Sequence, residues 1–369
     1  MTESSRQERA DAGRTSGWRR VLGGLTGRAI ALGVGFALPA GAIAAAGPTP
    51  TFDEVMTYLH FDAAERARVM RGEIVGKDFR EHDEKEISVA VVTRIATPLP
   101  RLAEEIRKGE LLHADQEVLD FRASAPGTPL EETFRNAGYT SKEGEEVRRL
   151  LAALPGSTFN LSAAELDRLR AARTRFPGGD CDRKPACAGE LSGLYRGMLQ
   201  ERLARYQADG LNGVAPYDRG SGKKVLPAEE LRHAAEDAEL IRRAFPEFYR
   251  AFTEFPQEQR EKYDSQFLWI KRRVQGRPAF ALAHRLSDVR PDVALFAERQ
   301  FYVGTSYNSL QTFVGLLPDG DRTILVYTNR TFTDQVAGFG SNVRHSVGRS
   351  KLMEAVTRIF ETLRRRVAA

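Results

Sequence analysis

The chain has 369 residues, of which 41% are hydrophobic and 28% charged. This is typical of a globular protein with one large domain or two ordinary ones, and it excludes a disordered protein, a membrane protein with many spans and a disulfide-dense scaffold. The formal net charge is +5, but the first 46 residues contain six arginines and three acidic residues. The rest of the chain has 49 Lys and Arg against 47 Asp and Glu, so its charge gives no argument for nucleic-acid binding.

The N-terminal segment has the three parts of a secretory signal peptide: a basic region, an uncharged stretch of 18 residues, and small side chains at its end. We therefore predict a signal peptide over residues 1–46, cleaved after Ala46 or alternatively after Ala44, and a periplasmic or secreted protein. Arg19-Arg20 resembles part of a twin-arginine signal, so the Sec and Tat routes both remain open. A retained membrane anchor is the alternative, although four Gly or Pro residues weaken such a span. With cleavage, the protein keeps no stable membrane span.

The first stretch of the mature chain, residues 51–125, combines helix and strand. Thr51-Phe-Asp-Glu54 has the capping-box pattern that opens a helix. Alternating apolar residues over 86–95 predict a half-buried strand. A short helix is expected over 99–112 and another strand over 117–122.

The second stretch, about residues 126–262, is charged and mainly helical. Thr128-Pro-Leu-Glu131 and Ser162-Ala-Ala-Glu165 have further capping-box patterns, and an apolar stripe continues from Leu191 to Tyr206 at helical spacing. The polar, Gly-rich loop over 209–224 resembles the end of a P-loop, but it lacks the first glycine and the final hydroxyl residue. A phosphate-binding loop is therefore not expected.

Cys181 and Cys187 are the two cysteines of the chain and lie in this second stretch. In an oxidising compartment this close pair predicts a disulfide bond. Unpaired thiols and a functional role are the alternatives. Metal binding is weakly indicated because no histidine lies nearby and two thiolates supply only half of a zinc site. Redox catalysis is weakly indicated because the spacing is not Cys-x-x-Cys.

The third stretch, residues 263–369, predicts antiparallel strands followed by one long helix. The strands are expected over 266–274, 279–286, 295–303, 309–317 and 322–328. Gln275-Gly-Arg-Pro278 and Pro318-Asp-Gly-Asp321 have the composition of turns. Apolar residues from Leu352 to Val367 recur on one face of the final helix, and the arginines at 364–366 suit the negative end of its dipole.

The late strands are rich in aromatic side chains, and the chain ends in a Gly-containing loop and an amphipathic helix. Near its start, a strand is followed by Pro98-Leu-Pro-Arg-Leu102, where a proline opens a helix. Both ends resemble the helix-grip arrangement of START and Bet v 1-like lipid-binding proteins. The resemblance implies one α+β domain, residues 47–369, with a curved antiparallel sheet, a long C-terminal helix and a helical insertion at about 126–262.

In that fold the space between sheet and helix is an apolar cavity, so the resemblance implies binding of an apolar small molecule or lipid. The candidate ligand-binding residues are four aromatic side chains of the late strands and one histidine in an apolar strand: Phe267, Trp269, His284, Phe301 and Tyr302. For the aromatic residues the alternative is a filled core. For His284 it is a hydrogen-bonded residue at the end of a strand.

Several short runs resemble elements of a family of uncharacterised exported bacterial proteins, over most of residues 50–369. These runs are Gly179–Asp182 with Lys184, Tyr206–Leu211, Phe267–Lys271 leading to Gly276–Pro278 and His284, and Glu298–Tyr302. This resemblance implies no activity, so no functional residue follows from it.

The sequence contains no nucleophile elbow, no His-Glu-x-x-His zinc motif and no Rossmann glycine fingerprint. Its six histidines include no pair at metal-ligand spacing, so we predict neither a metal site nor a cofactor. Two other functions stay open beside ligand binding. They are a hydrolase or cyclase-like enzyme on the same scaffold, and a ligand-free interaction protein of the cell envelope.

Overall fold

The structure is a computed structural model that describes residues 48–156, 158–176, 185–258, 261–338 and 340–368. The chain divides into two units, residues 1–43 and 44–369, and every described residue belongs to the second. The strands are β1 (Val75–Asp78), β2 (Glu86–Ile95), β3 (Val118–Ser124), β4 (Tyr217–Gly220), β5 (Lys223–Val225), β6 (Asp264–Val274), β7 (Arg277–Val289), β8 (Ala294–Val303), β9 (Ser309–Asp319) and β10 (Arg322–Phe332). The α-helices are α1 (Phe52–Tyr58), α2 (Ala63–Met70), α3 (Leu99–Arg107), α4 (Glu110–Ala114), α5 (Leu130–Thr133), α6 (Gly144–Leu151), α7 (Ala163–Arg175), α8 (Pro185–Asp209), α9 (Pro227–Glu236), α10 (Glu239–Ala244), α11 (Pro246–Thr253) and α12 (Ser341–Ala368). Two short 3₁₀ helices span Ser141–Glu143 and Gly210–Gly213.

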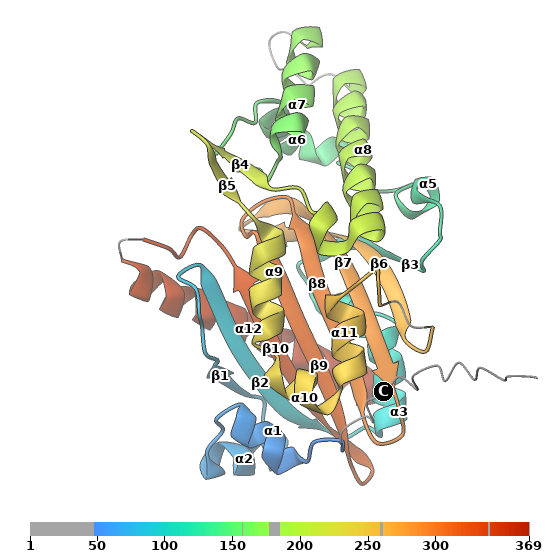
Figure 1. The fold of residues 1–369 in the computed structure, drawn as a ribbon, viewed down its shortest axis with the longest axis vertical. Helices are drawn as coiled ribbons and strands as arrows, with labels where there is room; N and C mark the ends of the chain where they lie inside the picture. Colours follow the sequence, from blue (N-terminus) through green and yellow to red (C-terminus); the bar gives the residue numbers. More distant parts are fainter. Residues whose placement is uncertain (1–47, 157, 177–184, 259–260, 339, 369) are drawn as a thin grey trace, which may run out of the picture. The chain divides into compact units, whose positions relative to one another are not determined.

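Eight strands form one antiparallel sheet in the order β1-β2-β10-β9-β8-β7-β6-β3 (Figure 1). The late strands β6 to β10 pair consecutively, each with the next along the chain. The early strands complete the sheet on both sides, because β2 pairs with β10 and β3 pairs with β6. The predicted α+β fold, with an antiparallel sheet, a long C-terminal helix and a helical insertion, is confirmed.

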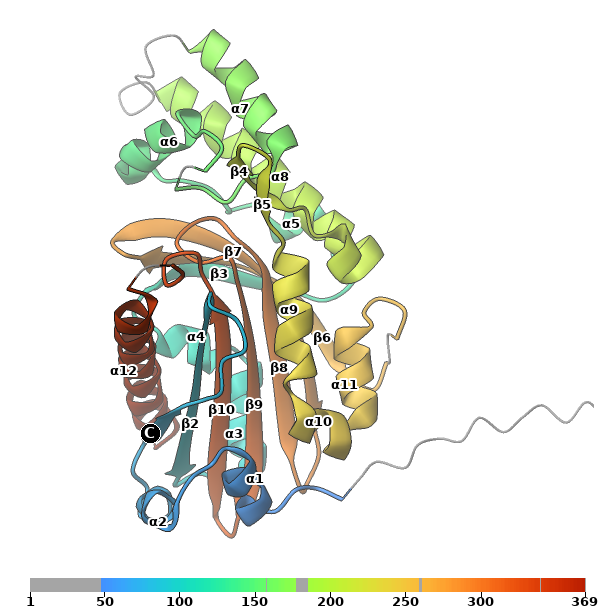
Figure 2. The same cartoon turned by 60° about the vertical axis from the view of Figure 1, so that its left-hand side comes forward.

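Different helices cover the two faces of this sheet (Figure 2). On one face, here named the α12 face, α12 and α3 pack against apolar strand residues that include Val91, Phe296 and Val314. On the opposite face, α1, α10 and α11 pack against residues such as Leu295 and Leu317. Successive side chains of a strand point to opposite faces, so each strand contributes to both layers.

Local sequence signals set the ends of several helices. Thr51 and Ser162 each accept a hydrogen bond from the backbone amide three residues further on, which confirms the capping boxes predicted there. The capping box predicted at Thr128 is wrong. There α5 starts at Leu130, and Pro129 occupies the N-cap position without a side-chain acceptor.

Two-residue turns join strands at two places where the backbone takes positive φ. Gln275 and Gly276, with φ of 51° and 77°, connect β6 to β7 and confirm the predicted hairpin. Ser221 and Gly222, with φ of 53° and 75°, connect β4 to β5 in the same way. The segment predicted as a loop over 209–224 therefore contains a short hairpin, and its glycine at position 222 serves the turn.

The helical insertion occupies the chain between β3 and β6, close to the predicted range. Its long helix α8 packs against aromatic residues of β6, β7 and β8 on the opposite face of the sheet. A buried ion pair joins α8 to α7: two guanidinium nitrogens of Arg202 lie 2.7 and 2.5 Å from the carboxylate oxygens of Glu165. The insertion thus has its own internal polar link as well as an apolar base on the sheet.

Two sequence predictions concern residues that the structure does not describe. The predicted signal peptide, residues 1–46, lies outside the described residues, and its cleavage stays a prediction. The predicted disulfide also stays a prediction, because Cys181 lies outside the described part of the chain. Cys187 is described and is buried near the start of α8. Within the described ranges, none of the helices combines the length and apolar character that crossing a membrane requires.

Candidate ligand-binding site

A cavity lies between the α12 face of the sheet and the helices that cover it, and we name it the sheet–helix cavity. Its volume is about 130 Å³, comparable with the ~150 Å³ cavity that holds a benzene molecule. Its apolar lining includes Ile106, Phe296, Leu310, Val314, Leu352, Ala355, Val356 and Phe360. Its polar lining consists of Asp115, Arg272, Arg285, Glu298, Gln300, Thr312, Tyr327 and Asn329.

One polar group of this cavity is built across β7 and β8. Arg285 stands opposite Glu298 in the strand pairing, and its Nε and Nη2 atoms donate to one Glu298 oxygen at 3.1 and 2.7 Å. Gln300 follows two residues later on the same face and donates to the other Glu298 oxygen at 3.2 Å. The two charged side chains are only 11% and 13% exposed, so each supplies the counter-charge that the other needs.

A second ion pair lies beside the first. Arg272 of β6 donates to Asp115 at 2.7 Å, and the Tyr307 hydroxyl donates to Gln300 at 2.6 Å. Burial acts to lower the pKa of Arg272, but Tyr307 and Asp115 outweigh it and raise the pKa above its ordinary value. The polar end of the cavity therefore holds two cations and two anions in two pairs, with little net charge.

The remainder of the cavity is apolar with neutral hydrogen-bonding groups at its side. Phe360 of α12 packs edge-to-face on Tyr327, with ring centroids 5.7 Å apart. Asn329 donates to the Tyr327 hydroxyl at 3.0 Å, and burial raises the pKa of Tyr327, so the phenol stays neutral. An apolar wall with a few convergent polar groups is the usual composition of a small-molecule site.

The five residues predicted to bind a ligand lie on the opposite face, not in the sheet–helix cavity. Phe267, Trp269, Phe301 and Tyr302 are each 1% exposed and pack beneath the insertion. Tyr206 of α8 stacks on Phe301 with ring centroids 3.9 Å apart. These are the contacts of a packed core, and ligand binding by the predicted residues stays a prediction.

His284 is fully buried between two hydroxyl groups. Its Nδ1 lies 2.9 Å from the Tyr206 hydroxyl and its Nε2 lies 3.0 Å from the Ser265 hydroxyl. Burial, together with the charge of Arg299, lowers the pKa of His284 to about 3, so the ring is neutral at pH 7. Neither of these hydrogen-bond partners is a carboxylate, which is the group that usually orients a general-base histidine. This geometry favours the structural role for His284.

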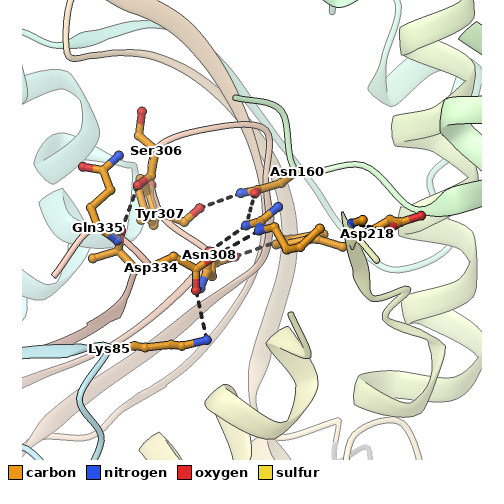
Figure 3. Close-up of polar contacts among 12 residues, drawn as sticks. Lys85, Asn160, Asp218, Ser306, Tyr307, Asn308, Asp334 and Gln335 are labelled. Carbon is orange, nitrogen blue, oxygen red and sulfur yellow. Dashed lines mark hydrogen bonds and ion pairs between the residues drawn. The ribbon is translucent and has the colours of Figure 1, made fainter. Parts of the chain in front are cut away.

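A polar cluster, here named the insertion junction, ties the insertion to the sheet (Figure 3). Arg219 of β4 donates to Asn160 at 2.7 Å, to Asn308 at 3.2 Å and to Asp334 at 3.0 Å. Lys85 completes the cluster with an ion pair to Asp334 at 3.0 Å. Across the residues that the structure describes, no group of three or more His, Cys, Asp or Glu side chains is arranged to hold a metal ion.

Glu230 of α9 borders the insertion junction and makes stability depend on pH. It accepts hydrogen bonds from Asn308 at 3.0 Å and from Ser309 at 2.7 Å. Burial, assisted by the charge of Asp334, raises the pKa of Glu230 from its ordinary 4.5 to about 7. Because the folded state then holds this proton more tightly than the unfolded state, the stabilisation is complete below about pH 4.5 and is lost as the pH rises through about 7.

Glu230→Gln should remove this pH dependence. As the pH rises from 5 to 8, the free energy of unfolding of the natural protein should fall relative to the variant by about 2–3 kcal/mol. Urea unfolding at four pH values measures the difference, and Glu229→Gln at the exposed neighbouring position is the control. A difference that stays constant across this range would show that Glu230 does not hold the proton.

No protein-family model matches the chain, and no curated protein matches it. Among solved structures, the chain resembles the crystal structure of Ara h 8.0201, with 11% identity, 38% of this chain and 89% of that chain covered, and a TM-score of 0.20. It also resembles the di-domain ARO/CYC StfQ from the steffimycin biosynthetic pathway, with 10% identity, 74% and 96% covered, and a TM-score of 0.23. Both resemblances are weak, so the chemistry of the site rests on the cavity itself. Membership of a family of exported bacterial proteins stays a prediction.

The sequence pattern did not indicate the polar residues of the sheet–helix cavity. Arg272, Arg285 and Glu298 lie within strands that were correctly predicted. Arg285 is followed by Leu286 and Glu298 is preceded by Ala297, whereas both sequence neighbours of Arg272 are basic. The sequence signal for these residues was a charged residue inside a predicted strand. This signal does not show whether the charged side chain is buried, because burial depends on which helix covers each face of the sheet.

Proposed function

We propose that this protein binds a small, mainly apolar and uncharged molecule in the sheet–helix cavity, and that it does so outside the cytoplasm after export. The observation that carries this proposal is a cavity beneath α12 with an apolar wall and a polar end whose charges are already paired. Burial of apolar ligand surface in it would contribute roughly 25 cal/mol per Å². A lipid fragment or a small aromatic compound has this chemistry.

The paired charges support an uncharged ligand. A charged ligand would have to separate Arg285 from Glu298, or Arg272 from Asp115. Separation would leave one partner buried without a counter-charge, at a cost of about 3–5 kcal/mol. A hydroxyl or carbonyl group on the ligand can instead hydrogen-bond to Gln300 and its neutral neighbours without disturbing either pair.

The size of the cavity supports a compact ligand. A volume of about 130 Å³ accommodates one ring or a short branched chain. A longer molecule would require α12 to move away from the sheet. The predicted signal peptide supports the extracytoplasmic part of the proposal, and the predicted disulfide between Cys181 and Cys187 would suit an oxidising compartment.

An enzyme of the cyclase or hydrolase type on the same scaffold is the second candidate. The convergence of Asp115, Glu298 and Tyr327 on one cavity favours it, since paired carboxylates and a phenol can transfer protons. Each of these carboxylates is already engaged by an arginine. Binding without chemistry is therefore the better supported function.

Benzyl alcohol, which combines one ring with one hydroxyl, is a suitable probe for this cavity. We expect the protein to take it up in native mass spectrometry and in calorimetric titration, and to bind the cation benzylamine at least tenfold more weakly. Ala355→Phe should abolish uptake, because the added ring fills the cavity from α12. Val343→Phe, at a position on the same helix that is 70% exposed, should leave binding unchanged.

Two results would contradict the proposal. One is a natural protein that carries no extractable small molecule and takes up no neutral probe. The other is an Ala355→Phe variant that folds and still binds benzyl alcohol with undiminished affinity.

A further inference from the structure

A second cavity lies on the opposite face of the sheet, beneath α1 and α10, and we name it the opposite-face cavity. Its volume is about 80 Å³. Its walls are mainly apolar and include Val55, Leu240, Phe245 and Phe313, while one end is polar and includes Gln311 and Arg330. It is separated from the sheet–helix cavity by the sheet itself, since the two are lined by residues that point to opposite faces of the same strands.

Arg299 of β8 pairs across the strands with Gln311 of β9, which lines this polar end. Its side chain is completely buried, and none of its three guanidinium nitrogens makes a hydrogen bond to a described residue. The ring of Phe252 covers the guanidinium at 4.0 Å from the ring centroid. Burial lowers the pKa of Arg299, and the Tyr206 phenol, which is neutral, is the main group that counteracts this.

Gln311 is the second buried polar side chain without a hydrogen-bond partner in the described chain. Its side chain is 2% exposed and lines the cavity, and neither its amide nitrogen nor its amide oxygen has a hydrogen-bond partner in the described chain. Arg330 lies at the same end, but its charge is already met by Glu86 and Asp237. Arg299 and Gln311 are therefore the neighbouring donors that still require an acceptor.

We propose that the opposite-face cavity binds a monocarboxylate with a short apolar chain, with its carboxylate between Arg299 and Gln311. A buried cation without a counter-charge is strongly unfavourable, so an anion is the group that this position favours. The planar guanidinium presents parallel N–H donors that match the two oxygens of a carboxylate. The mainly apolar walls suit the chain of the ligand and exclude a multiply charged anion.

Gly315 of β9 offers a way to close the cavity without altering Arg299. It lines the cavity, and a Cβ at this position would meet only the Cβ of Val326 at 3.9 Å, an ordinary contact. A β-branched residue suits a strand. Gly315→Ile should therefore fold and occupy the space of the ligand chain.

Butanoate is the probe for this site, with 1-butanol and acetate as controls that remove the charge or the chain. Calorimetric titration of the natural protein should give butanoate at least tenfold tighter binding than either control. Arg299→Met should reduce the affinity for butanoate to that for butanol, and Gln311→Leu should weaken it by several fold. Gly315→Ile should abolish binding. Ala355→Phe, which fills the sheet–helix cavity, should leave it unchanged, so failure of this site and failure of the proposed function can be told apart.

The thermal stability of the ligand-free protein gives an independent readout. Arg299→Met should raise the Tm, because it removes an uncompensated buried charge while keeping the volume of the side chain. A fall in Tm would show that the guanidinium is satisfied within the protein and would overturn the proposal. Equal affinities for butanoate and butanol, or for butanoate and acetate, would overturn it as well.

Discussion

Replacing Glu165 by glutamine should lower the free energy of unfolding by about 3–5 kcal/mol, because it leaves the guanidinium of Arg202 buried without its counter-charge. The two side chains are only 9% and 5% exposed. Burial acts to lower the pKa of Arg202, but Glu165 outweighs it and raises the pKa, and the guanidinium lies 4.2 Å from the Tyr302 ring centroid. Glutamine can still accept the capping hydrogen bond from the Ser162 backbone, so the loss reports on the charge.

The same two helices provide a matched control. Arg168 of α7 and Glu201 of α8 form a two-pronged ion pair with distances of 2.6 and 2.8 Å, but their side chains are 40% and 47% exposed. Glu201→Gln should cost less than about 1 kcal/mol, because water can solvate the arginine that remains. Urea unfolding followed by circular dichroism measures both variants. Equal losses at the two sites would show that burial does not set the strength of the link between α7 and α8.

Phe360→Ala should destabilise the protein by about 3–5 kcal/mol, because it removes the largest apolar side chain with which α12 closes the sheet–helix cavity. Phe360 is 1% exposed, and its ring packs on Tyr327 and lines the cavity. The substitution also enlarges the cavity by the volume of a ring. Benzene should therefore raise the Tm of the variant more than that of the natural protein, since a ligand that binds only the folded state stabilises it.

Val343→Ala on the same helix is the control for this experiment. Val343 is 70% exposed, so the truncation should change the free energy of unfolding by no more than about 0.5 kcal/mol. A small loss at Phe360, or a benzene response equal in both proteins, would mean that α12 does not close a cavity of this kind.

The strands and the final helix were predictable because their signals are local. Alternating apolar residues over 86–95 and along the late strands predict strands, although β2 is buried on both faces and not half-buried as expected. Gly276 with its neighbour Gln275 specifies the turn between β6 and β7. β1, with four residues, carries too short a pattern to be seen. It is held in place by its pairing with β2, which no local signal records.

The face on which the aromatic residues lie was not predictable, because it depends on packing between distant elements. The pairing of β7 with β8 shifts register between Leu282 and Ala283, and this bulge leaves Phe301 without a partner. As a result, the consecutive residues Phe301 and Tyr302 both contribute to the core beneath the insertion. Simple alternation would have sent one of them towards α12.

The three polar residues at 298–300 of β8 show that the polar residues of the two cavities were also not predictable from the sequence. Glu298 and Gln300 line the sheet–helix cavity, whereas Arg299 between them points to the opposite face. Glu298 finds its partner Arg285 on the neighbouring strand, while the described chain offers no ion-pair partner to Arg299. The local sequence does not indicate whether either charged residue has an ion-pair partner, because strand register determines which side chains are neighbours.

The pairing of β2 with β10 also constrains when the protein can fold. Ile95 pairs with Thr323 and Glu86 with Phe332, so partners stand 228 to 246 positions apart in the chain. During synthesis, β2 can pair with β10 only after almost the entire polypeptide has been made, and contacts of such sequence separation form slowly. The sheet is therefore completed only near the end of synthesis, when β10 becomes available to join β2 to β9.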